Sequence, residues 1–363
     1  EMPNDQDNYE SVVQAKRTEA VAEFANDRKG ALAHLQHALH VNPALVPLFV
    51  LVASIITFGL LLGSKFFSPF ALTLILQQVQ IVGIVAAAQS LVILTAGIDL
   101  SVGAIAVLSS VIMGQFTFRY GMPVEVAVAL GLAFGTLVGS INGWLVAVMK
   151  LPPFIVTLGM WQIVLAANFL YSANETIRSQ EIEAEAPLLQ FLGTTFKIGA
   201  DAEGRGGATF TYGVIAMVLI FAVLAYVLSQ TAWGRHVYAV GDDPEAAQLS
   251  GVNVRYTLIS VYAVTGFICA IAGWALIGRI GSVSPTSGQL LNIESITAVV
   301  IGGISLFGGR GSILGPLFGA LIVGVFTLGL RLAGADAQWT FLLIGVLIIG
   351  AVTVDQWIRK VSA

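Results

Sequence analysis

The sequence predicts an all-α, polytopic membrane protein with about ten transmembrane helices. Its 363 residues are 56% hydrophobic and only 10% charged, whereas ordinary soluble domains carry roughly 25% charged residues. The mean hydropathy is +0.86. Most of the chain consists of successive apolar runs. Each run is long enough to cross a bilayer, which takes ~20 residues. A net charge of −4 gives no sign of nucleic-acid binding.

The chain begins with a polar tail, residues 1–44, that we expect in the cytoplasm. Because the first apolar run starts only near Leu45, the order is wrong for a cleaved signal peptide, and the first helix is expected to be an uncleaved anchor. Three histidines recur every third residue in the tail, which fits either a metal site or a wetted interfacial helix; no carboxylate or cysteine accompanies them, which favours the helix. The basic residues of the tail, which favour the cytoplasmic side, are Lys16, Arg17, Arg28 and Lys29. The three histidines are His34, His37 and His40.

Ten apolar runs make up the predicted membrane domain, residues 45–358. An even number of spans places both termini on one side, and Arg359 and Lys360 favour the cytoplasm for that side. Some of the spans are expected to be broken or re-entrant. The predicted spans are 45–63, 73–96, 101–117, 124–149, 154–172, 211–230, 257–279, 292–308, 313–333 and 338–357.

The long connection 173–210 between the fifth and sixth runs is expected outside the cell. It carries an acidic excess, which suits an external loop although acidic residues contribute little to orientation. Its length fits either a surface for an external partner or a tolerated insertion. The acidic residues are Glu175, Glu181, Glu183, Glu185, Asp201 and Glu203, against Arg178, Lys197 and Arg205.

The stretch Leu94–Gly103, which reads LTAGIDLSVG, interrupts two apolar runs. Gly97 and Gly103 permit a tight break, and either Asp99 or Ser101 can cap the helix that follows. A break at membrane depth usually lines a cavity, because backbone polar groups cannot be left unpaired in lipid. A short interfacial turn between two ordinary spans remains an equal alternative.

Glycines recur every fourth residue on span 124–149 and leave one helix face without side chains. Such a face lets another helix backbone approach closely, so these residues indicate packing and no chemistry. Asn142 on the same span is either a packing hydrogen-bonder or a pathway residue. The glycines are Gly131, Gly135, Gly139 and Gly143, and Gly315 and Gly319 repeat the spacing later in the chain.

The segment 292–315 carries an acidic residue beside an apolar run. Glu294 is a functional candidate if it lies within the membrane, where ionisable groups are costly, but that cost largely vanishes at the external interface. The glycine-rich turn 308–311 follows, with Arg310 expected on the cytoplasmic side.

The polar loop 231–256 contains a small helix of its own. Asp243 suits the N-cap, Pro244 the first helical position and Gly251 a left-handed stop after the last turn. Good helix formers lie between them, EAAQL at 245–249. The loop is either a simple solvated turn or a helix that is presented to a partner.

Three motifs in this chain resemble the permease subunits of bacterial ABC importers for monosaccharides, such as the ribose, xylose and fructose permeases. The motifs are GR-x₂-YAVG-x-x-PEAA-x-x-SG-V in loop 231–256, AGIDLSVG at 96–103 and IGGIS-LFGG-RGS-x-x-G at 301–315. The AGIDLSVG string is the most specific of the three. The resemblance covers roughly Pro43 to Ile358.

The resemblance implies a multi-pass permease subunit of the bacterial inner membrane. It implies three protein partners: a second copy of this chain, a cytoplasmic ATPase that binds ATP and Mg²⁺, and a periplasmic sugar-binding protein; no cofactor is expected on this chain. In such permeases the loop helix docks into a groove of the ATPase, which points to Asp243, Pro244, Glu245, Ala246, Ala247 and Gly251. Residue type and depth alone suggest Gln89, Asp99, Ser101, Asn142, Gln162 and Glu294 as candidates for the sugar pathway.

What the sequence lacks agrees with an external energy source. There is no G-x-x-x-x-G-K-[ST] run for ATP, and H-E-x-x-H, G-x-S-x-G and paired cysteines are missing. We therefore expect a transport subunit and no enzyme. Two alternatives remain: an ABC permease for a nucleoside or another small solute, and an ion-coupled secondary carrier that acts alone, which would normally show more buried acids or arginines.

Overall fold

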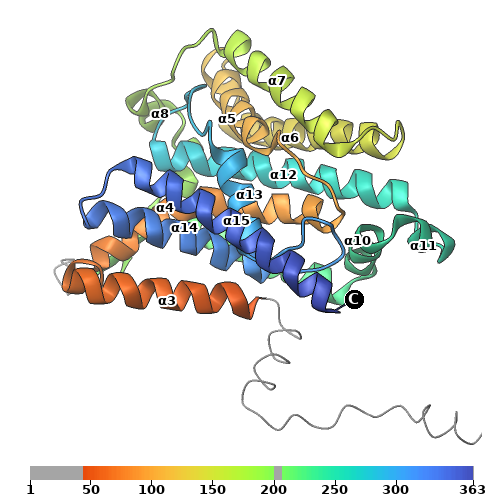
Figure 1. Ribbon diagram of the computed structural model, residues 1–363. Helices are drawn as coiled ribbons and strands as arrows, with labels where there is room; N and C mark the ends of the chain where they lie inside the picture. The colour runs from red at the N-terminus through yellow and green to blue at the C-terminus, as the bar shows by residue number, and fades with distance from the viewer. Residues whose placement is uncertain (1–43, 200–206, 363) are drawn as a thin grey trace, which may run out of the picture. The chain divides into compact units, whose positions relative to one another are not determined.

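The computed structural model describes residues 44–199 and 207–362. The chain divides into two units, 1–42 and 43–363, of which the second is compact. The first unit, with the predicted tail helix and the three histidines, lies outside the described residues. The second unit is the helical domain described below (Figure 1).

Ten apolar helices form this domain within the described residues, as the sequence predicts. Seven of them are long and apolar enough to span a membrane; two apolar helices are shorter, at 102–118 and 291–301, and the last helix has a shorter apolar part at 338–350. The helices are α3 Leu45–Leu62 with the 3₁₀ turn η1 Gly63–Lys65, α4 Pro69–Leu94, α5 Val102–Phe118, α6 Val124–Ala147, α7 Pro153–Ser172, α9 Tyr212–Gln230, α12 Val254–Ile280, α13 Leu291–Ile301, α14 Leu314–Leu332 and α15 Ala337–Ser362.

The predicted span 292–308 is wrong in its second half. Helix α13 ends at Ile301 after 11 residues, and an irregular loop follows up to α14. Gly303, Gly308 and Gly309 take positive φ values of 76°, 81° and 68° in this loop, which residues with a Cβ rarely adopt. Helix α13 is therefore too short to cross a bilayer and begins inside the bundle.

The connection 173–210 has its own folded structure. It contains α8 Ser179–Glu185, the 3₁₀ helix η2 Pro187–Gly193, and the antiparallel strands β1 Thr195–Ile198 and β2 Ala208–Thr211. Ile182 and Leu189 are fully buried, and the indole of Trp274 on α12 donates to the Leu188 carbonyl at 3.0 Å. The connection therefore packs onto the helices as part of the domain.

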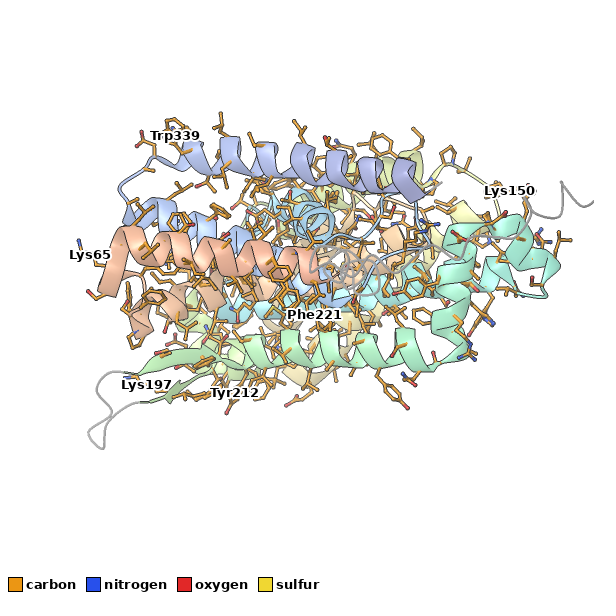
Figure 2. The ribbon with its side chains drawn as sticks, turned by 60° about the horizontal axis from the view of Figure 1, so that its bottom comes forward. Lys65, Lys150, Lys197, Tyr212, Phe221 and Trp339 are labelled. Atoms are coloured by element: carbon orange, nitrogen blue, oxygen red, sulfur yellow. The ribbon has the colours of Figure 1, made fainter. Side chains whose placement is uncertain are left out.

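The polar loop after α9 contains two helices rather than the single helix expected. Helix α10, Ala232–Asp242, precedes the predicted small helix α11, Pro244–Leu249. Both lie at one end of the bundle, called here the α11 end, where α3 begins and α15 ends (Figure 1). The opposite end carries the β-hairpin with Lys197, as well as Lys65, and is called the hairpin end (Figure 2).

Helices α4 and α12 form the centre of the domain. Every residue of α4 from Val79 to Leu94 is buried, and α12 packs against α4, α5 and α6. A Cβ at Gly139 of α6 would collide with the Tyr262 carbonyl of α12, and Gly135 and Gly143 face α12 in the same way. The predicted close helix contact is thus confirmed: three of the four glycines face α12, and Gly131 faces α5, where an added Cβ would lie 3.1 Å from the Ser109 carbonyl oxygen. Cys269, the single cysteine of the chain, is fully buried on α12.

Candidate functional site

The capping pattern predicted for α11 is confirmed. The Asp243 carboxylate accepts from the N–H groups of Glu245 at 2.9 Å and Ala246 at 3.0 Å. Gly251 lies just beyond the helix with a φ of 88°. Only Ala247 of this helix is buried, so the other side chains face outward and Ala247 holds the helix to the domain.

The sequence analysis did not select Leu249, which is the most exposed apolar side chain of the helix. It is 90% exposed. An apolar residue at the tip of a capped surface helix is suited to burial against another protein. The six predicted coupling residues surround it on α11 and at its two ends.

Helix α10 connects α11 rigidly to the end of α4. A Cβ at Gly241 would collide with the Leu94 carbonyl oxygen, and the same oxygen accepts from the Gly309 N–H at 3.0 Å. We call this meeting of Leu94, Gly241 and Gly309 the three-way contact. It joins the last turns of α4 and α10 to the glycine-rich loop before α14.

Two side chains strengthen the attachment of α10. The Tyr238 hydroxyl donates to the Gly311 carbonyl at 3.0 Å, and burial raises the pKa of Tyr238, so it stays a neutral donor. The Trp233 indole donates to the Ser260 hydroxyl of α12 at 2.8 Å. Helix α10 is therefore held to α12 and to the loop before α14 by hydrogen bonds, and to the end of α4 by a close backbone contact.

The chain between α4 and α5 is irregular, and Ser101 takes the N-cap position of α5, but neither Asp99 nor Ser101 makes a side-chain cap hydrogen bond. Ala96 takes a left-handed φ of 59°. Asp99 Oδ1 accepts from the Ser101 N–H at 2.7 Å and from the Ser101 hydroxyl at 2.6 Å. Both side chains thus close a turn before the helix, and the Ser101 side chain makes no cap hydrogen bond.

Four predicted pathway residues meet at this break in one fully buried network. The Gln89 amide, oriented to satisfy its neighbours, donates to the Asp99 carbonyl at 3.0 Å and accepts from the Asp99 N–H at 3.2 Å. Asn142 of α6 donates to the Ser101 hydroxyl at 3.0 Å, and Thr157 of α7 donates to the Ile98 carbonyl at 3.0 Å. These hydrogen bonds pair the backbone N–H and C=O groups of the irregular segment, which lipid could not pair.

The same network contains buried polar atoms that make no hydrogen bond to the described residues. Asp99 Oδ2, Asn142 Oδ1 and the Tyr262 hydroxyl are buried and have no hydrogen-bond partner among the described residues. The Tyr262 hydroxyl lies against the break, 2.9 Å from where a Cβ at Gly97 would stand. Asp99 therefore sits among neutral polar groups.

The other two pathway candidates lie elsewhere. Gln162 is exposed on α7, outside the network, and its role stays a prediction. Glu294 is partly exposed on α13 and lines a cavity of about 280 Å³ with Gln78 and Arg331. Arg279 donates to the Gln78 side chain at 2.7 Å and attracts Glu294 electrostatically.

A second cavity, of about 290 Å³, lies between α5, α7 and the segment before α13. Trp161, Phe169, Asn168, Gln289 and Asn292 are among its lining residues. None of these five residues is a candidate from the sequence, although Trp161 is the direct neighbour of Gln162. In a membrane helix both the lipid face and the core face are apolar, so periodicity does not show which side chain points inward.

Comparison with known proteins places this architecture in a family. The model of the family described as "Branched-chain amino acid transport system / permease component" matches residues 71–352. The chain is 70% identical over 98% of its length to a fructose import permease of Rhizobium meliloti, covering 96% of that protein. The chain belongs to the permease family of bacterial monosaccharide ABC importers.

Two further relatives carry the same assignment. A ribose import permease of Bacillus subtilis is 37% identical over 84% of this chain and 89% of its own length. A xylose transport system permease of Escherichia coli is 31% identical over 86% of this chain and 93% of its own length. The protein is thus a permease subunit, a transport component rather than an enzyme, and a multi-pass protein of the bacterial inner membrane.

Proposed function

We propose that this sugar permease works as a homodimer with two partners: a cytoplasmic ATPase that holds ATP and Mg²⁺, and a periplasmic binding protein that delivers a monosaccharide. No cofactor is assigned to this chain. The observation that carries the proposal is α11, a capped and outward-facing helix that the three-way contact ties to α4. The identity to a fructose permease makes fructose the first pentose or hexose to test.

In this proposal the α11 end faces the cytoplasm. Both termini of the membrane domain then lie on the cytoplasmic side, because α3 begins and α15 ends at that end (Figure 1). The folded connection 173–210, whose hairpin lies at the opposite end, faces the periplasm and offers the surface for the binding protein. The orientation agrees with the positive-inside argument for the N-terminal tail.

The mechanism follows from the contacts of α10 and α11. Closure of the ATPase dimer on ATP displaces α11, and α10 transmits the displacement to Leu94 at the end of α4. The break that follows is bonded to α6 through Asn142 and to α7 through Thr157. A push on the α4 end therefore shifts several helices together, and the sugar passes between the two copies of the chain.

The first test is a pull-down of the permease from native membranes with its ATPase. We expect the double variant Glu245→Lys, Ala246→Glu to lose at least about 90% of the bound ATPase, since two charge changes are placed within a small, central helix of the interface. The matched control is Ile198→Glu, an exposed apolar residue on β1 at the hairpin end, which should bind as wild type does. Equal binding by all three proteins, or no ATPase with any of them, would reject the coupling role of α11.

The main alternative is a carrier that is driven by an ion gradient. A substitution of Asp99 distinguishes this carrier from an ATP-driven importer. We expect Asp99→Asn to retain ATP-driven fructose uptake in proteoliposomes within about fivefold, because the amide oxygen still accepts both bonds from Ser101 at a cost of about 1 kcal/mol. A lone carrier that uses Asp99 would instead lose uptake and would transport without ATP. Uptake measured with ATP alone, with a proton or sodium gradient alone, and with both decides the question.

The solute class is tested in the same vesicles. The description of the matching family names branched-chain amino acids, whereas the names of the relatives given above name sugars. We expect saturable uptake of fructose and none of leucine or a nucleoside. Uptake of leucine without fructose would assign the chain to the amino-acid branch of the family.

A further inference from the structure

The second cavity lies where two short helices meet inside the bundle. Helix α5 begins at Val102 and α13 begins at Leu291. A Cβ at Gly103 would lie 3.0 Å from the Asn292 backbone nitrogen and 3.2 Å from the Leu291 Cβ, so the first turns of both helices are in contact. Gly103 and Asn292 both line the cavity. Discontinuous helices of this kind often form the substrate sites of transporters.

The lining has the chemistry of a site for a neutral, hydroxyl-rich ring. It contains three planar amides, Asn168, Gln289 and Asn292, and two aromatic side chains, Trp161 and Phe169. None of the cavity's lining residues is charged, whereas the first cavity is lined by Glu294 and Arg331. The volume, about 290 Å³, lies just below the range of small-molecule sites, which begins near 300 Å³.

Asn168 supplies an independent sign of a ligand. Its side chain is 1% exposed, and its amide nitrogen donates to the Pro285 carbonyl at 2.7 Å. A carbonyl can only accept, so this bond fixes the amide with its oxygen on the other side. That oxygen is buried and has no hydrogen-bond partner within residues 44–199 and 207–362. A buried acceptor without a donor is unfavourable, and a ligand hydroxyl in the cavity would supply the missing donor.

We propose that this cavity is the resting site of the monosaccharide within the permease. The ring lies against Trp161, and one hydroxyl donates to Asn168 Oδ1. This inference rests on the proposed function, because it takes the transported solute to be a sugar. It also places the site next to the moving parts: the Asn292 amide donates to the Leu100 carbonyl of the break at 3.4 Å, so a shift of the break changes the floor of the cavity.

The test uses the complete importer in proteoliposomes, with permease, ATPase, binding protein and radiolabelled fructose. We expect Trp161→Leu and Asn168→Leu each to lower the fructose taken up per ATP hydrolysed about tenfold, because a ring contact or a hydroxyl acceptor is lost. ATPase binding and hydrolysis stimulated by the binding protein should stay as in wild type. Trp161→Phe keeps an aromatic face and should restore most of the ratio.

The matched control is Leu170→Ala on the same helix α7, because the Leu170 side chain is 82% exposed and does not line the cavity. It should leave the ratio unchanged. Wild-type ratios in both Trp161→Leu and Asn168→Leu, with fructose uptake intact, would overturn the cavity assignment and leave the proposed function standing. Absence of ATP-driven uptake in the wild-type importer would instead reject the proposed function. Because Trp161 is only half-buried, its variant stays informative even if Asn168→Leu fails to fold.

Discussion

Replacing Gly241 with valine is expected to abolish ATP-driven sugar uptake while the permease stays folded in the membrane. A Cβ at this position would collide with the Leu94 carbonyl oxygen and would lie 2.7 Å from the Gly309 nitrogen. All of these atoms belong to the backbone, so α10 has to move away from α4. The local cost of such overpacking is about 1–3 kcal/mol, which a domain of this size tolerates, but the three-way contact is lost.

The measurement compares sugar uptake with ATP hydrolysis in the reconstituted importer. We expect the ATPase still to bind, because α11 keeps its own cap, while hydrolysis no longer drives uptake. Gly159→Val is the control: this helix glycine on α7 has no atom within 4 Å of an added Cβ. If Gly241→Val transports as well as Gly159→Val, the force from α11 reaches the membrane helices by a route other than Leu94.

Replacing Gly266 with valine is expected to remove most of the folded protein from the membrane. A Cβ there would collide with the Gly135 carbonyl oxygen and lie 3.1 Å from the Gly139 Cα. The two backbones of α6 and α12 are in direct contact, so no side chain can rotate to make room. The helices have to separate along their whole contact, and the loss exceeds the usual ~1–3 kcal/mol for overpacking.

Folded yield after mild detergent extraction, followed by size-exclusion chromatography and thermal unfolding, measures this effect. Gly350→Val provides the control, because Gly350 is an exposed helix glycine of α15 with open space around an added Cβ. We expect a yield close to wild type for Gly350→Val and a yield several-fold lower for Gly266→Val. If the two variants gave similar amounts of folded protein and similar unfolding temperatures, the α6–α12 contact would have to adapt to the added side chain, which contradicts the prediction.

The sequence predicts best those features that depend on neighbours along the chain. The cap of α11 needs only Asp243 and the next three residues, and the close helix contact needs only glycines at a spacing of four. Helix α10 was missed because Gly234 and Gly241 lower its helix propensity and its stability comes from tertiary contacts. One of these is the bond from Tyr238 to Gly311, 73 residues away.

The candidate site could be predicted only in part. Residue type selected six pathway candidates one by one, and four of them, Gln89, Asp99, Ser101 and Asn142, meet at the break. The sequence does not show that these side chains form hydrogen bonds with the irregular segment, because the bonding partners come from separate helices. The cavity beside them joins α5, α7 and the segment before α13, so its composition depends on the packing of segments more than 100 residues apart, such as Asn168 and Pro285.

The single cysteine has a practical consequence for spectroscopy. Because Cys269 is fully buried in α12, its thiol is shielded from maleimide reagents in the folded protein, which react with accessible thiolates. A cysteine introduced at the 90% exposed position Leu249 can therefore be labelled with a fluorophore against a silent native background. The emission of that label would report docking and release of α11 during turnover, in a chain that needs no other substitution.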